Sequence, residues 1–130
     1  MSMAGQVNGG WSATLPAHCP PADASAPLGD VYRLLSSIPP SPDDMKTPAE
    51  LDKFKNQDEC LRSSLSCAID LQHIEDLRGS TPRFKEYKVA VASLDGSHGV
   101  IKQTGRPGHY SLWLFAAVLA QANTLFKAHP

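Results

Sequence analysis

The chain has 130 residues, of which 42% are hydrophobic and 19% are charged, and its 12 basic and 13 acidic side chains leave a formal net charge of -1. These values predict one soluble domain and argue against a membrane-spanning protein. The dense patch of Lys and Arg that binds a phosphate backbone is missing from the sequence, so nucleic-acid binding is not expected.

Residues 1–28 are predicted to form a disordered arm. They combine Gly-Gly and Pro-Pro pairs with small polar residues and show no sustained hydrophobic period. The N-terminus has neither a basic region nor a continuous apolar region, so it does not resemble a Sec-type signal peptide. We therefore expect a cytoplasmic protein, and the alternative is a protein exported without such a signal.

The cysteines give no sign of a disulfide framework or a zinc site. Cys19, Cys60 and Cys67 are an odd number and form no Cys-x-x-Cys pair. A reducing compartment is the simplest interpretation, and no metal ion or cofactor is predicted.

Residues 29–46 are predicted to hold a short amphipathic helix and a linker. Val31, Leu34, Leu35 and Ile38 recur at helical spacing behind Asp30, which predicts a helix over residues 29–38. Pro39-Pro40 ends it, and the Pro-rich residues 39–46 follow as an extended segment. Such a short helix must dock, either on its own domain or in the groove of a partner.

The residues from 47 to 130 are predicted to form a helical domain. Thr47, Pro48 and Glu50 have the pattern of a capping box with proline at the first helical position, and the helix that they begin is expected to run to about Leu77. The second half of this helix carries two apolar stripes, as a helix between two neighbours does.

Residues 84–94 leave two structures open. Phe84, Tyr87, Val91 and Leu94 follow a helical spacing, which predicts a second helix. However, Tyr87, Val89 and Val91 also alternate with a period of two, so a strand is the alternative.

The C-terminal part is predicted to be a Gly-rich loop followed by a buried helix. Residues 95–109 contain four glycines and form the loop, and residues 110–127 are apolar nearly all round. The continuous apolar run from Leu112 to Ala120 is much shorter than the ~20 residues that a bilayer span needs. The sequence therefore predicts a mainly α protein, a small helical bundle with a disordered N-terminal arm, and an α+β fold if residues 84–94 form a strand.

A thiol and a histidine are the candidates for catalysis. The stretch YKVAVASLDGSHGVIKQTGRPGHYSLWLF resembles the histidine box of ubiquitin-specific cysteine proteases, in which a strand and a Gly-rich loop precede Gly-His-Tyr and another strand. That resemblance implies a thiol-dependent hydrolase or deamidase with His109 as the base. Cys67 would be its nucleophile, with Asp70 or Gln103 to orient the histidine. Residues 58–67 do not reproduce the family's cysteine box, and a small buried cysteine is the competing interpretation of Cys67.

The preferred hypothesis is a non-enzymatic protein that binds another protein or associates with itself. An adaptor, an assembly subunit or a secreted effector would fit, because the predicted helices display more apolar surface than so small a domain covers. The residues expected at this surface are Val31, Leu34, Leu35, Ile38, Trp113, Leu114, Val118 and Leu125.

Overall fold

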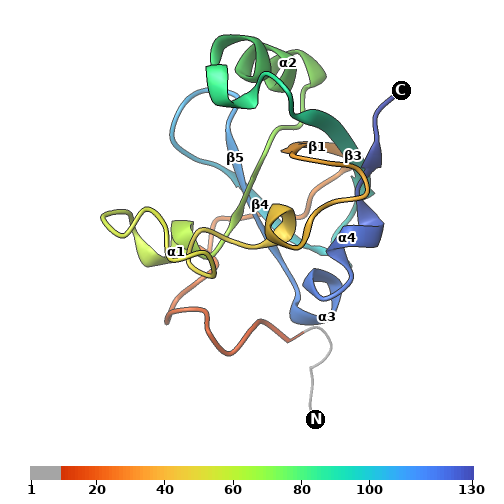
Figure 1. Cartoon of the computed structure of the whole chain (residues 1–130). Helices are drawn as coiled ribbons and strands as arrows, with labels where there is room; N and C mark the ends of the chain where they lie inside the picture. Colours follow the sequence, from red (N-terminus) through yellow and green to blue (C-terminus); the bar gives the residue numbers. More distant parts are fainter. Residues whose placement is uncertain (1–9) are drawn as a thin grey trace.

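Antiparallel strands form the framework of the protein in a computed structural model, which describes residues 10–130 (Figure 1). The strands are β1 (Gly29–Leu35), β2 (Leu65–Cys67), β3 (Lys88–Leu94), β4 (Gly99–Gln103), β5 (Tyr110–Leu114) and β6 (Lys127–Ala128). The helices are α1 (Glu59–Arg62), α2 (Leu71–Ser80), α3 (Ala116–Leu119) and α4 (Ala122–Leu125), and short 3-10 turns lie at Pro42–Met45 and Pro82–Phe84.

The strands form two three-stranded sheets, in the orders β1-β3-β6 and β2-β5-β4. An isolated antiparallel bridge joins them: Tyr32 in β1 and Ala68, directly after β2, exchange backbone hydrogen bonds of 2.8 and 2.9 Å. Backbone pairing therefore runs from β6 to β4 through both sheets. Beyond this bridge, β1 and β2 separate.

The main hydrophobic core lies between the two sheets. Along β1, Val31 and Leu35 face this core, and along β5, Leu112 and Leu114 do so. Phe126, which precedes β6, is 2% exposed and adds its ring to the same cluster. Since side chains alternate across a strand, Tyr32 and Leu34 in β1 and Trp113 in β5 point to the opposite faces of the sheets, whereas Arg33 shares the face of Val31 and Leu35.

Helix α2 covers the outer face of the β1-β3-β6 sheet, as Figure 1 shows at the top of the molecule. Its buried Ile74 packs in a second cluster with Ala68 and Val89, and Tyr32 and Leu34 of β1 lie against this cluster. Asp70 begins the helix, because its carboxylate accepts a hydrogen bond of 2.8 Å from the backbone N–H of Gln72.

Residues 10–28 contain only turns, bends and one bridge position, and they lie against the domain. A disulfide links Cys19 to Cys60, and Ser25 exchanges backbone hydrogen bonds with Ile101 of β4. Near its start, the segment places the ring of Trp11 4.4 Å from that of Phe115. The disulfide corrects the expectation that the cysteines stay reduced. The first nine residues of the predicted arm lie outside the described residues.

The predicted helical bundle is wrong, and the mixed α+β alternative describes the fold. The helix expected over residues 29–38 is strand β1, whose side chains alternate between the core and α2. Val31 and Leu35 satisfy a helical spacing of four, but four is also an even number, so the same pair lies on one face of a strand. The segment forms a strand and not a helix because it pairs with β3.

The single helix expected over residues 47–77 is also wrong, although its first turn forms as expected. Thr47 N–H donates to Glu50 Oε1 at 2.9 Å, and Glu50 N–H donates to Thr47 Oγ1 at 3.2 Å. The chain then leaves the helical path, since Asp52 and Phe54 both have positive φ angles. The rest of the region divides into α1, β2 and α2.

The two remaining helix predictions fail because strands occupy their apolar runs. Residues 88–94 form β3, which is the alternative that the period-two pattern favoured, and residues 110–114 form β5. Within the predicted loop, residues 99–103 form β4. Among residues 10–130, no helix combines the length and the hydrophobicity needed to cross a membrane.

Candidate active site

The pairing of β2 with β5 brings a serine and a histidine together. Ser66 lies opposite Ser111, and His109 is two residues before Ser111 on the same face. A diagonal pair of this kind is within reach of a long side chain. The Nε2 atom of His109 lies 3.0 Å from Oγ of Ser66, whose residue is exposed.

The other ring nitrogen of His109 fixes the tautomer. Nδ1 lies 2.9 Å from the backbone carbonyl oxygen of Thr104, which can only accept a hydrogen bond, so Nδ1 carries the proton. In the neutral ring, Nε2 is then an acceptor, and the Ser66 hydroxyl donates to it. Thr104 follows β4 and pairs with His109 through its backbone N–H, which donates to the His109 carbonyl at 3.1 Å.

A second hydroxyl contact supports Thr104. Its Oγ1 lies 2.8 Å from Oγ of Ser111, which is buried, and 3.2 Å from Nδ1 of His109. The chain Ser66–His109–Thr104 therefore has the geometry of a nucleophile, a base and a group that orients the base. A backbone carbonyl holds the position that a carboxylate occupies in the Ser-His-Asp arrangement.

Cys67, the nucleophile expected from the sequence, faces the interior. Its residue is 3% exposed, and burial raises the pKa of its thiol to about 12, although the charge of Arg33 acts in the opposite direction. A thiol with so high a pKa contains almost no thiolate near neutral pH. The proposed orienting groups are engaged elsewhere, since Asp70 caps α2 and Gln103 donates to the carbonyl of Arg106.

Arg33 occupies the gap where β1 and β2 separate. Its guanidinium donates to the backbone carbonyl of Ser66 and, at 2.8 Å, to that of Asp44. Within residues 10–130, its Nε has no hydrogen-bond partner. Desolvation lowers the pKa of Arg33, and the nearby Cys67 and Asp44 partly oppose this effect. This buried cation holds the backbone of the candidate nucleophile. Because 33 residues separate the two positions, no local pattern could predict the contact.

A cavity of about 360 Å³ is lined by His109 and by Cys67, the residue that follows Ser66, although Ser66 itself is not part of the lining. One wall is a face of α2 that includes His73, Leu77 and Ser80, and the opposite wall is residues 106–109. Gly108 makes this approach possible: it has a φ of +87°, and a Cβ atom there would lie 2.6 Å from Cδ2 of His73.

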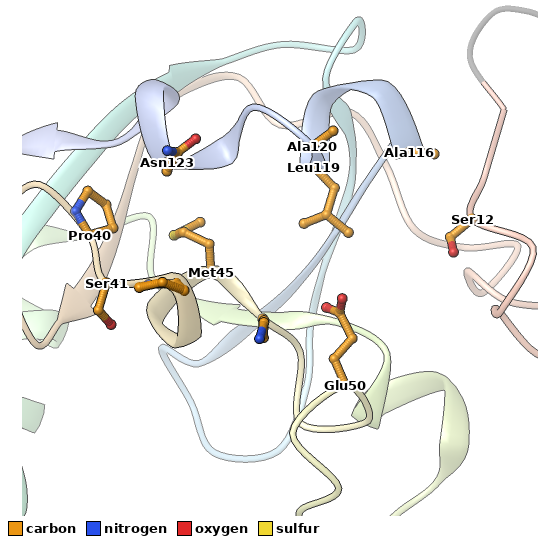
Figure 2. Close-up of a pocket in the computed structure, with 11 residues that line it drawn as sticks. Ser12, Pro40, Ser41, Met45, Glu50, Ala116, Leu119, Ala120 and Asn123 are labelled. Carbon is orange, nitrogen blue, oxygen red and sulfur yellow. The ribbon is translucent and has the colours of Figure 1, made fainter.

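A larger cavity of about 530 Å³ lies elsewhere, between the segment around Met45 and helix α3 (Figure 2). Figure 2 shows Met45 and Leu119 extending into it, with Glu50 nearby. Its lining contains neither histidine nor cysteine. Among the described residues, no group of three His, Cys, Asp or Glu side chains could hold a metal ion.

The residues expected at a partner surface lie mostly inside the molecule. Four of them are buried, namely Val31, Leu35, Trp113 and Leu114. The other four, Leu34, Ile38, Val118 and Leu125, are partly buried against the two hydrophobic clusters. A protein partner or a second copy would therefore have to bind mainly through other residues.

The comparisons with known proteins identify no relative. No protein-family model, no curated protein and no solved structure matches the chain.

Proposed function

We propose that the protein is a small hydrolase of esters or amides, with Ser66 as the nucleophile and His109 as the general base. The hydrogen-bond chain from Ser66 Oγ to His109 Nε2, and from His109 Nδ1 to the Thr104 carbonyl, carries this proposal. The exposure of Ser66 and the adjoining cavity support it, because a substrate must reach the hydroxyl.

The reaction would proceed in two stages. Ser66 Oγ forms a bond to the acyl carbon of the substrate while its proton moves to His109 Nε2. The imidazolium then gives this proton to the leaving alcohol or amine as the bond to the acyl carbon breaks. Water releases the acyl group from Ser66 with His109 again as the base, so the enzyme returns to its starting state.

The surroundings of the site favour this chemistry in two ways. The Thr104 carbonyl accepts the Nδ1 proton and keeps the ring directed at Ser66. Arg106 lines the cavity beside His109, and its permanent charge favours a reaction in which negative charge develops on the substrate.

The Cys19–Cys60 disulfide supports an oxidising compartment as the place where this hydrolase acts. Disulfides persist outside the reducing cytosol, in secreted and periplasmic proteins and on cell surfaces. This favours the export alternative over the cytoplasmic one.

Turnover of p-nitrophenyl acetate tests the proposal. The wild type should release nitrophenolate, and Ser66→Ala and His109→Ala should each reduce kcat by about a hundredfold or more, because each removes one member of the pair. Ser63→Ala is the matched control, since the Ser63 hydroxyl only donates to the Glu59 carbonyl. Equal turnover in wild type and Ser66→Ala would refute the proposal.

A further inference from the structure

The cavity beside Ser66 has an apolar interior and a polar rim. The apolar lining comes from Ala68 and Cys67 at the end of β2 and from Ile74 and Leu77 of α2. Cys67, Ala68 and Ile74 are all buried, so they form a fixed apolar floor of the cavity. His73, Asp76, Ser80 and Arg106 supply the polar lining.

The cavity reaches the candidate base and the residue next to the candidate nucleophile. His109 lines the cavity and bonds to Ser66, and Cys67, the next residue after Ser66, lines it as well. A group attached to the carbonyl carbon that Ser66 attacks can therefore extend along α2 between His73 and Ser80. The cavity is at the lower end of the size range of ligand sites, which hold small molecules and not large polymers.

The charges near the cavity decide which substituent fits. Asp76 already accepts a hydrogen bond of 2.8 Å from Nε2 of Gln72, and both Asp76 and Arg106 are exposed residues of the lining. Neither Asp76 nor Arg106 is part of the apolar floor of the cavity. Burial of a charged substituent there would cost free energy without a paired group, whereas burial of methylene groups is favourable.

We infer that this cavity binds the acyl part of the substrate, and that the substrate class is an ester or amide of a short aliphatic acid. The inference rests on the proposed function for the attack by Ser66. Beyond that function, it states how the substrate is selected: the acyl group must fit against the wall formed by α2.

A series of p-nitrophenyl esters measures this selection. From acetate to butyrate to hexanoate, kcat/KM should rise by about tenfold or more, because each added methylene group becomes buried. For palmitate it should fall again, because the chain exceeds the cavity. A value of kcat/KM that does not change with chain length would overturn the inference.

A substitution that fills the cavity tests the same inference by mutation. Ser80 is exposed and lies at the end of α2, so Ser80→Trp should fill the outer part of the cavity without disturbing the core. The variant should lose the preference for hexanoate, so that kcat/KM for hexanoate falls to the value for acetate or below it. Gln72→Trp adds the same side chain to the same helix outside the cavity lining and should behave as the wild type. Equal loss on all esters in Ser80→Trp would contradict the inference.

Binding of hexanol separates this inference from the proposed function, because it requires no turnover. In NMR spectra of Ser66→Ala, hexanol should shift the methyl signals of Ala68, Ile74 and Leu77, and Ser80→Trp should abolish these shifts. Shifts at these methyl groups in a protein that hydrolyses no ester would keep the binding site and reject the hydrolase. Ester turnover that depends on Ser66, without such shifts, would keep the hydrolase and reject the acyl site.

Discussion

Burial separates two adjacent residues of β2 that could both act as nucleophiles. Ser66 is exposed and bonded to His109, and Cys67 is buried with a pKa raised to about 12. In a strand, neighbouring side chains point to opposite faces, so only one of the two can meet a histidine on the outer face. The strand geometry therefore selects the hydroxyl.

The raised pKa of Cys67 predicts a loss of stability in alkali. The thiol has an ordinary pKa of 9.0 in the unfolded chain and about 12 in the folded protein. The stabilisation is thus complete below 9.0 and is lost as the pH rises above it, since only the unfolded state releases the proton. At about pH 10, this thiol should have reduced the free energy of unfolding by about 1 kcal/mol.

Urea unfolding at about pH 8 and about pH 10 measures this effect. The wild type should lose about 1 kcal/mol more than Cys67→Ala over this interval, because the variant has no thiol to titrate there. Other titrating groups are common to both proteins and cancel. The same loss in both proteins would show that the thiol is not protected.

Replacing Arg33 by a side chain of similar length should lower the stability of the protein strongly. Arg33→Met leaves the carbonyls of Ser66 and Asp44 without their donor, and each buried unsatisfied group costs about 1 to 3 kcal/mol. Relief of the desolvated charge offsets part of this cost, so unfolding measurements should show a net loss of about 2 to 4 kcal/mol. Arg83→Met is the control, because Arg83 is exposed and lies over the Phe84 ring. Equal stability of the two variants would contradict the role given to Arg33.

At the scale of elements, the local sequence pattern predicted one turn correctly but not the helices and strands. The Thr47–Glu50 capping box forms, yet it caps a single turn. Apolar runs such as residues 29–38 fit both a helix and a strand, and only pairing with distant strands decides between them. His109 could be chosen from the sequence because Gly108, His109 and Tyr110 resemble a histidine box. Ser66 was missed because a helix was assumed where Leu65, Ser66 and Cys67 alternate as a strand does.

The pairing of β4 with β5 depends on a glycine that has no room for a side chain. A Cβ atom on Gly99 would lie 2.0 Å from the backbone oxygen of Trp113, which cannot move without breaking the ladder. Gly99→Ala should therefore reduce the free energy of unfolding by about 2 to 4 kcal/mol.

A second glycine gives the control. Gly79 in α2 has no atom within 4 Å of its Cβ position, so Gly79→Ala should raise stability by about 0.5 to 1 kcal/mol. Thermal melts of both variants test the pair. A Gly99→Ala protein that melts with the wild type would mean that β4 and β5 pair differently.

At the scale of the whole molecule, one covalent link and a few contacts fix the N-terminal segment. Trp113 is 1% exposed and lies on the face of β5 opposite Leu112 and Leu114, and its Nε1–H donates to the carbonyl of Cys60 at 3.0 Å. The disulfide to Cys19 thus connects residues 10–28 to the part of the domain that contacts this indole. Spacing could not predict the bond, because 41 residues separate its cysteines.

Removal of the disulfide should destabilise the protein. For a loop of 41 residues, the chain-entropy estimate is about 4 kcal/mol. The double variant Cys19→Ser, Cys60→Ser should have a correspondingly lower urea midpoint of unfolding, and dithiothreitol should not change that midpoint. In the wild type, dithiothreitol should lower the midpoint to the value of the double variant. If dithiothreitol leaves the wild-type midpoint unchanged, the disulfide does not constrain the fold.

Labelling with a fluorophosphonate tests the account most directly, because this reagent reacts with serine hydroxyls that a base activates. We expect one adduct per chain, located by mass spectrometry on Ser66, absent in His109→Ala and retained in Ser63→Ala. An unlabelled wild type, an adduct on another serine, or undiminished labelling of Ser66 in His109→Ala would contradict it.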